Sequence, residues 1–156
     1  MTNITIIDCY TDEPSGFGVP PYLGIFPRYI AGYVKQRIPD ANITYLTVDD
    51  LRAADPTFDK VRKSDDTDVF IYNQTKNNVE ETLANTDHLY VVVGVQVPGK
   101  YLSAVPGTFR EITTLLERHG VLEMRAGKKE HKLERFVFAG PAMSEFGTQV
   151  QGGKFA

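Results

Sequence analysis

The chain has 156 residues, of which 42% are hydrophobic and 24% are charged, an ordinary composition for a globular domain with its own core. Its formal net charge of −3 argues against a nucleic-acid binder, because there is no basic excess to meet the phosphates. The single cysteine, Cys9, cannot form an internal disulfide, and alone it cannot hold a zinc ion or an iron–sulfur cluster. One free cysteine fits a reducing compartment, and neither a signal peptide nor an apolar run of about 20 residues is visible, so we expect a cytoplasmic location.

The first half of the chain predicts two strands around a helix. Residues 3–9 are short and β-branched, and residues 42–48 repeat that character, so both predict strands. Residues 25–38 predict a helix, because large apolar side chains recur there at helical spacing. We expect that stripe to face the core; it consists of Ile25, Tyr29, Ile30, Tyr33, Val34 and Ile38. Asp49 and Asp50 then indicate a helix cap or a turn.

The middle of the chain is more polar before it becomes apolar again. Residues 52–66 carry charges of both signs and indicate a surface excursion, and residues 68–73 are a candidate for an extra strand. Residues 79–85 predict a short helix. Residues 88–95 form a nearly continuous apolar run, which predicts a strand buried on both faces, as in a parallel sheet covered by helices on either side.

The last third predicts one more helix and one more strand. Residues 107–119 have the pattern of a helix, which Gly120 closes. Residues 125–134 are rich in lysine and glutamate and indicate a solvated crossing. Residues 135–140 then predict the fourth strand.

Alternation of strands and helices predicts an α/β fold with a doubly wound, mainly parallel sheet, Rossmann-like or flavodoxin-like. Four strands are few for this architecture, and the usual final helix and strand are not evident, so we expect truncation at the C-terminal end. We expect residues 1–147 to form a single domain. The glycine-rich residues 148–156 predict a flexible tail or the start of a linker.

Three predicted loops share one edge of this sheet. They are 9–24, 96–107 and 140–147, each follows a predicted strand, and each contains proline and glycine. Ligands of open parallel sheets bind beyond the carboxyl ends of the strands, where the strand order reverses. The loops therefore indicate a binding rim, although loops of any kind are commonly rich in glycine and proline.

Several familiar sites are disfavoured at this rim. A dinucleotide fingerprint would place its third glycine at Pro21, and prolines lack the N–H groups that cradle phosphate. A magnesium phosphotransfer site built on Asp8, Asp12 and Glu13 lacks the further aspartate that such sites use. The three histidines show no metal-ligand spacing, so structural roles are favoured for them, and Cys9 is expected to be a buried, unreactive thiol.

The opening stretch, IIDCYTDEPSGFGVPPYLGIFPRYIAGYV, resembles the N-terminal cobalamin (B12)-binding-type domain of archaeal radical S-adenosylmethionine (SAM) proteins. In that family an apolar first strand leads to a loop of the form P-x-G-x-G-x-P-P, with Leu-Gly close behind. Here those positions are Pro14, Gly16, Gly18, Pro20, Pro21, Leu23 and Gly24. The VVVGV strand with Gly94 resembles the family's third strand, and Gly140-Pro141 resembles its Gly-Gly-Pro segment, with Ala139 replacing the first glycine.

The resemblance implies a corrinoid site formed by the loops at the rim. Backbone at glycine can approach a large, flat, apolar ring closely, and prolines offer it rigid apolar edges. The implied cofactor-binding residues are Pro14, Gly16, Gly18, Pro20, Pro21, Gly94, Gly99, Gly140 and Pro141.

Two departures from the family pattern limit what the chain does alone. The cobalt-ligating histidine of the D-x-H-x-x-G signature is missing, because no histidine lies between Cys9 and Gly24. We therefore expect any corrinoid to bind without a protein histidine on cobalt. One cysteine cannot supply the C-x-x-x-C-x-x-C motif, so a 4Fe-4S cluster and SAM are expected only in a downstream catalytic domain of the same protein. The chain alone is expected to lack turnover.

Three functions remain open: two that belong to a longer protein, and a free-standing binder of a small ligand or nucleotide, which is the least favoured. The first is an accessory N-terminal domain of a radical SAM iron–sulfur enzyme that binds cobalamin or derives from a domain that does. The second is a Rossmann-like interaction module that docks on a catalytic domain without a small ligand. In both, the partner is the downstream radical SAM domain, with no nucleic acid and no membrane.

Overall fold

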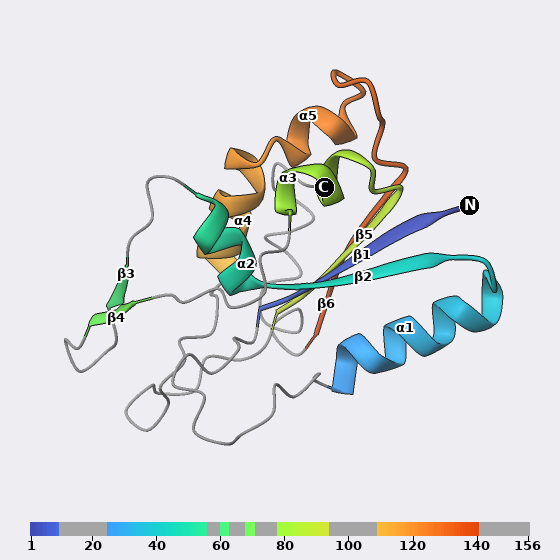
Figure 1. Ribbon diagram of the computed structural model, residues 1–156, viewed down its shortest axis with the longest axis horizontal. Coiled ribbons are helices and arrows are strands. Elements are labelled where there is room, and N and C mark those ends of the chain that lie inside the picture. The colour runs from blue at the N-terminus through green and yellow to red at the C-terminus, as the bar shows by residue number, and fades with distance from the viewer. Residues whose placement is uncertain (10–24, 56–59, 63–67, 71–77, 94–108, 141–156) are drawn as a thin grey trace.

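Four parallel strands form the central sheet of the computed structural model (Figure 1), which describes residues 1–9, 25–55, 60–62, 68–70, 78–93 and 109–140. The strands are β1 (Asn3–Asp8), β2 (Asn42–Thr47), β5 (His88–Val92) and β6 (Arg135–Ala139). Their order across the sheet is β2-β1-β5-β6. All three pairings are parallel, and they place Ile7 opposite Leu46 on one side and Val91 on the other. This order is that of a Rossmann-like or flavodoxin-like α/β fold, as the sequence predicted.

Helices lie on both faces of the sheet (Figure 1). Of the helices in the described part, α1 (Ile25–Arg37) is the one on the first face. The other face carries α2 (Val48–Ala54), α3 (Val79–Ala84), α4 (Phe109–Arg118) and α5 (Val121–Arg125). Because side chains alternate along a strand, β1 serves both layers: Ile7 points toward the four helices and Ile4 packs with Val34 of α1.

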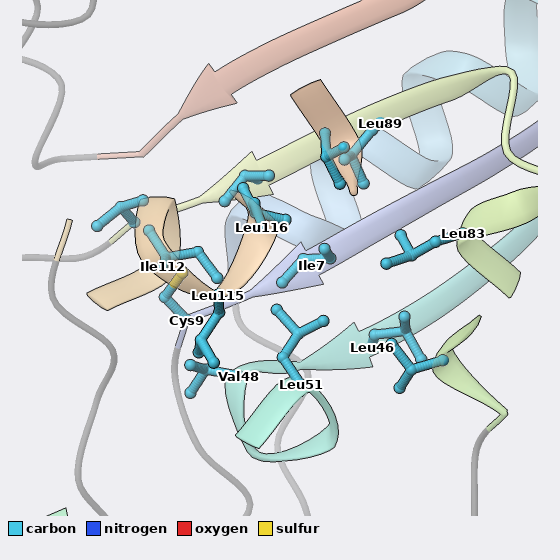
Figure 2. Close-up of a cluster of buried hydrophobic side chains, with 14 of the residues drawn as sticks. Ile7, Cys9, Leu46, Val48, Leu51, Leu83, Leu89, Ile112, Leu115 and Leu116 are labelled. Atoms are coloured by element: carbon cyan, nitrogen blue, oxygen red, sulfur yellow. The ribbon is translucent and has the colours of Figure 1, made fainter. Parts of the chain in front are cut away.

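The larger core lies between the sheet and the four helices, and Figure 2 shows it. Strand residues from β1, β2 and β5 meet helix residues spaced three and four apart on α4. The labelled members are Ile7, Cys9, Leu46, Val48, Leu51, Leu83, Leu89, Ile112, Leu115 and Leu116. Each is at most 3% exposed, so this layer supplies most of the hydrophobic stabilisation of the described part.

Local signals account for where the helices begin and end. The carboxylate of Asp50 accepts a hydrogen bond from the backbone N–H of Thr47 at 2.8 Å, which caps the start of α2. The side chain of Asn78 accepts from the N–H of Glu81 at 3.1 Å and caps α3. Gly120 has φ of 79°, in the left-handed region that glycine favours, and it ends α4 as predicted.

The predicted strands and helices are confirmed in type and order, with one described residue fewer at their ends, and residues 94–95 and 107–108 of the predicted ranges lie outside the described part. Residues 88–95 were predicted to lie inside the sheet, and the described part, β5, is flanked by β1 and β6. The candidate strand at 68–73 is present in part as β4 (Asp68–Phe70). It pairs antiparallel with β3 (Lys60–Arg62) as a separate two-stranded ribbon rather than joining the main sheet. Residues 141–156, which include the predicted tail, lie outside the described residues.

Three features differ from the sequence-based expectation. Residues 52–55 were expected in a surface excursion, but 52–54 complete α2 and Asp55 is its C-cap, and Arg52 and Asp55 are buried. The short helix α5 was not predicted. The stripe on α1 is narrower than expected: Tyr29 and Tyr33 are 75% and 57% exposed, because the helix meets the sheet through Ile30, Val34 and Ile38.

No helix in the described ranges is both long enough and apolar enough to cross a bilayer.

Candidate functional site at the carboxyl edge of the sheet

The carboxyl ends of the three neighbouring strands β1, β5 and β6 are held together by backbone hydrogen bonds. The N–H of Cys9, just after β1, donates to the carbonyl of Val92 at 2.9 Å. The N–H of Val93, just after β5, donates to the carbonyl of Ala139 at 2.9 Å. The chain therefore leaves these strands at three adjacent points of one edge, where the predicted loops begin.

This edge also contains the point where the strand order reverses. From β1 the chain goes first to β2 on one side and later to β5 on the other side. In open parallel sheets such a switch point is where ligands bind, because the connections on its two sides diverge and leave a crevice between them. Cys9 and Val93 are the last described residues on either side of the switch point.

Gly140 is the one predicted cofactor-binding residue that the structure describes. Its φ is +101°, which disfavours every residue with a side chain. A Cβ atom at this position would lie 2.5 Å from the carbonyl oxygen of Val93 and 3.1 Å from its nitrogen. The close approach of the two strand ends is thus a sufficient reason for glycine here. Its role in ligand binding stays a prediction.

The other predicted site residues fall outside the described part of the chain. The structure therefore places the start of each candidate loop and leaves the contribution of these residues as a prediction. They are Pro14, Gly16, Gly18, Pro20, Pro21, Gly94, Gly99 and Pro141.

A buried ion pair behind the edge was missed from the sequence. The side chain of Arg52 on α2 is fully buried, and its Nε and Nη2 atoms lie 2.5 Å and 3.0 Å from the two carboxylate oxygens of Glu111 on α4. This bidentate pair ties α2 to α4. The spacing of Thr47 and Asp50, typical of a capping box, was the available signal that a helix begins there and carries Arg52 inward.

Two further acidic groups are also held by the protein, Asp8 at the carboxyl edge and Asp55 after α2. Asp8, the last residue of β1, is fully buried, and one of its carboxylate oxygens accepts a hydrogen bond from the hydroxyl of Tyr45 at 2.7 Å. Asp55, just after α2, accepts one from Arg118 at 2.7 Å. These carboxylates are part of the scaffold.

Cys9 is 1% exposed and packs in the larger core. Burial is the main cause that raises the pKa of its thiol well above the usual range, and the nearby carboxylates of Asp8 and Glu111 raise it further. The guanidinium of Arg52 opposes this shift but does not outweigh it. The thiol stays protonated at neutral pH, so it serves neither as a nucleophile nor as a thiolate metal ligand.

The histidines lie away from the switch point. His88 begins β5, and His131 has its Nε2 atom 2.8 Å from the carboxylate of Asp87, so both belong to the opposite, amino edge. His119 follows α4 and lies 3.2 Å from the carbonyl oxygen of Leu51. Within the described ranges, no group of three histidine, cysteine or acidic side chains is placed to hold a metal ion.

Sequence comparison connects the chain to longer proteins. It is 30% identical over 149 residues to an uncharacterized protein of Methanocaldococcus jannaschii, and the aligned region covers 96% of this chain and 20% of that protein. It is 35% identical over 133 residues to an uncharacterized protein of Archaeoglobus fulgidus, covering 82% of this chain and 21% of that protein. The chain is related to archaeal proteins. It spans about a fifth of the length of these curated relatives, so it corresponds to one part of them.

The other two comparisons return nothing. No family model matches the chain, and no solved structure matches it.

Proposed function

We propose that these residues form an accessory domain of an archaeal radical SAM iron–sulfur protein and that they bind a corrinoid at the carboxyl edge. The observation that carries the proposal is the meeting of three strand ends at the switch point, with Cys9, Val93 and Gly140 at the start of the three candidate loops. The first of these loops contains the P-x-G-x-G-x-P-P pattern that resembles the cobalamin-binding-type family.

The described edge fits a corrinoid that has no protein ligand on cobalt. No described histidine lies at the switch point, and the carboxylate of Asp8 is buried against Tyr45. What the edge offers is mainly backbone, because the side chains of Cys9 and Val93 are buried in the core and Ala139 is small and partly exposed. Backbone without projecting polar side chains suits the face of a flat apolar ring. A bound corrinoid supplies radical or group-transfer chemistry at cobalt, and the protein holds and orients the ring.

The cluster and the SAM site belong to another domain in this proposal. Cys9 is the only cysteine of the chain, and it is buried and protonated, so it does not ligate iron. The relatives are about five times as long as the part that matches, which leaves room for a catalytic domain. Catalysis by the whole protein would then use this domain as the cofactor-holding partner.

Titration with cobalamin tests the proposal. We expect saturable binding by absorbance or calorimetry, and we expect Gly18→Trp to abolish it while the thermal unfolding transition is kept, because a rim position buries little core. Gly32→Ala on α1 is the matched control, and it should bind as the unchanged chain does, since nothing lies within 4 Å of the added carbon.

The negative result favours the second function. If a folded chain shows no binding at high micromolar cobalamin, and the same holds for the full natural polypeptide, the corrinoid proposal is wrong. The carboxyl edge is then better explained as a surface that docks on a catalytic domain without a small ligand.

A further inference from the structure

The outward face of α1 carries large aromatic side chains in water. Phe26, Tyr29 and Tyr33 are 42%, 75% and 57% exposed. Their spacing of three and four residues places them on neighbouring turns of one side of the helix. Figure 1 shows α1 on the face of the sheet opposite α2 and α4, so this aromatic side is not covered by them. Single exposed aromatics are ordinary, whereas a row of three on one helix is typical of an interaction surface.

The fold itself does not need these aromatic side chains. The helix packs on the sheet through Ile30, Val34 and Ile38, together with Ala41 and Tyr90. The stabilisation of α1 within the domain therefore comes from the opposite side of the helix.

Gly32 gives a second and independent sign of a partner. It lies in the interior of α1, one turn after Tyr29, where glycine weakens a helix relative to alanine. A Cβ atom added there would meet no atom within 4 Å, so packing inside the described part gives no reason for glycine. A missing side chain between exposed aromatics lets another backbone approach the helix closely.

The charge on α1 indicates the chemistry of the partner. The helix contains Arg28, Lys35 and Arg37 and no acidic residue, although the whole chain has a formal net charge of −3. The guanidinium of Arg37 lies 4.7 Å from the ring centre of Tyr33, which joins the cationic and aromatic parts of the surface. This surface complements an apolar patch with an acidic rim, and it would repel a second copy of itself.

We propose that the α1 face, defined by Phe26, Tyr29, Gly32, Tyr33 and Arg37, docks on an acid-rimmed apolar surface in another part of the same longer polypeptide. The matched relatives have about four fifths of their length outside the region shared with this chain, which supplies such a partner. The contact uses the side of α1 and not the carboxyl edge, so it is compatible with a corrinoid at that edge and independent of one.

Photo-crosslinking in the full natural polypeptide tests the contact. Benzoylphenylalanine replaces Tyr29, and a matched chain has it at Thr114, which is exposed on α4 across the sheet. After irradiation and digestion, we expect position 29 to join α1 to a peptide outside residues 1–156 that contains acidic residues, and position 114 to give no such product. Combining the probe at 29 with Arg37→Glu and Tyr33→Ala should lower the yield about tenfold, as loss of interface anchors does.

The remaining outcomes contradict the proposal. Products confined to residues 1–156, products that join two copies of the chain, or attachment to lipid or nucleic acid would each assign the α1 face to something else. Equal yields at positions 29 and 114 would show that the contact is not specific. Because none of these readouts uses cobalamin, failure here is distinguishable from failure of the corrinoid proposal.

Discussion

Glu111→Leu should lower the free energy of unfolding by about 3 kcal/mol, because it breaks a bidentate ion pair made by a buried guanidinium. The guanidinium of Arg52 is fully buried, and both oxygens of Glu111 meet its nitrogens. Without that carboxylate the guanidinium loses a bidentate, charge-assisted pair of hydrogen bonds. Urea unfolding followed by circular dichroism measures the change.

Two further variants separate a charge effect from general damage to α4. Arg52→Met combined with Glu111→Leu removes both charges, so it should recover at least half of the loss, because buried pairs are often replaceable by apolar side chains. Glu80→Gln is the surface control: its side chain is 80% exposed and lies 3.7 Å from His119, so its cost should stay within about 0.5 kcal/mol. A double variant no more stable than Glu111→Leu would show that the loss does not come from breaking the ion pair between Arg52 and Glu111.

Gly140→Ala should cost about 3 kcal/mol of folding stability. Part of the cost is backbone strain at φ of +101°, and part is the collision of the new Cβ with the carbonyl of Val93 at 2.5 Å. To relieve the strain or the collision, β5 and β6 would have to separate at the point where the N–H of Val93 donates to the carbonyl of Ala139. Thermal unfolding measures the loss.

Gly32→Ala is the contrasting glycine substitution, and it should stabilise the protein by about 0.5–1 kcal/mol. The helical backbone accepts alanine there, and the added carbon meets open space.

If Gly140→Ala costs less than about 1 kcal/mol, the ends of β5 and β6 do not approach as closely as described, and a ligand-based reason for Gly140 gains weight.

The sheet was predictable because its signals are local. The apolar run at β5 has too few polar residues to face solvent, and this composition predicted a strand inside a parallel sheet. The alternation of strands with helices predicted that all four strands are parallel. Gly120 likewise marked the end of α4 through its own conformational preference.

What the sequence did not reveal depends on contacts between distant segments. Arg52 was assigned to the surface because arginine usually lies there, and only the meeting of α2 and α4 pairs it with Glu111, 59 positions later. Tyr29 and Tyr33 were assigned to the core stripe because their spacing fits it, but periodicity does not give the width of the contact. At the candidate site, the common edge of the three loops follows from the predicted parallel sheet. Which strand ends are joined, Cys9 to Val92 and Val93 to Ala139, and the conflict between a Gly140 side chain and Val93 require coordinates.

The most direct test of the central claim is to follow backbone amide chemical shifts of the 156-residue chain during titration with cobalamin. If the carboxyl edge binds the corrinoid, the largest changes should be at Cys9, Val93 and Gly140, with little change at Asn3 and Asp87 on the amino edge. Saturable changes centred on the amino edge would contradict the account, and so would no change at millimolar cobalamin in a folded chain together with no binding by the full natural polypeptide.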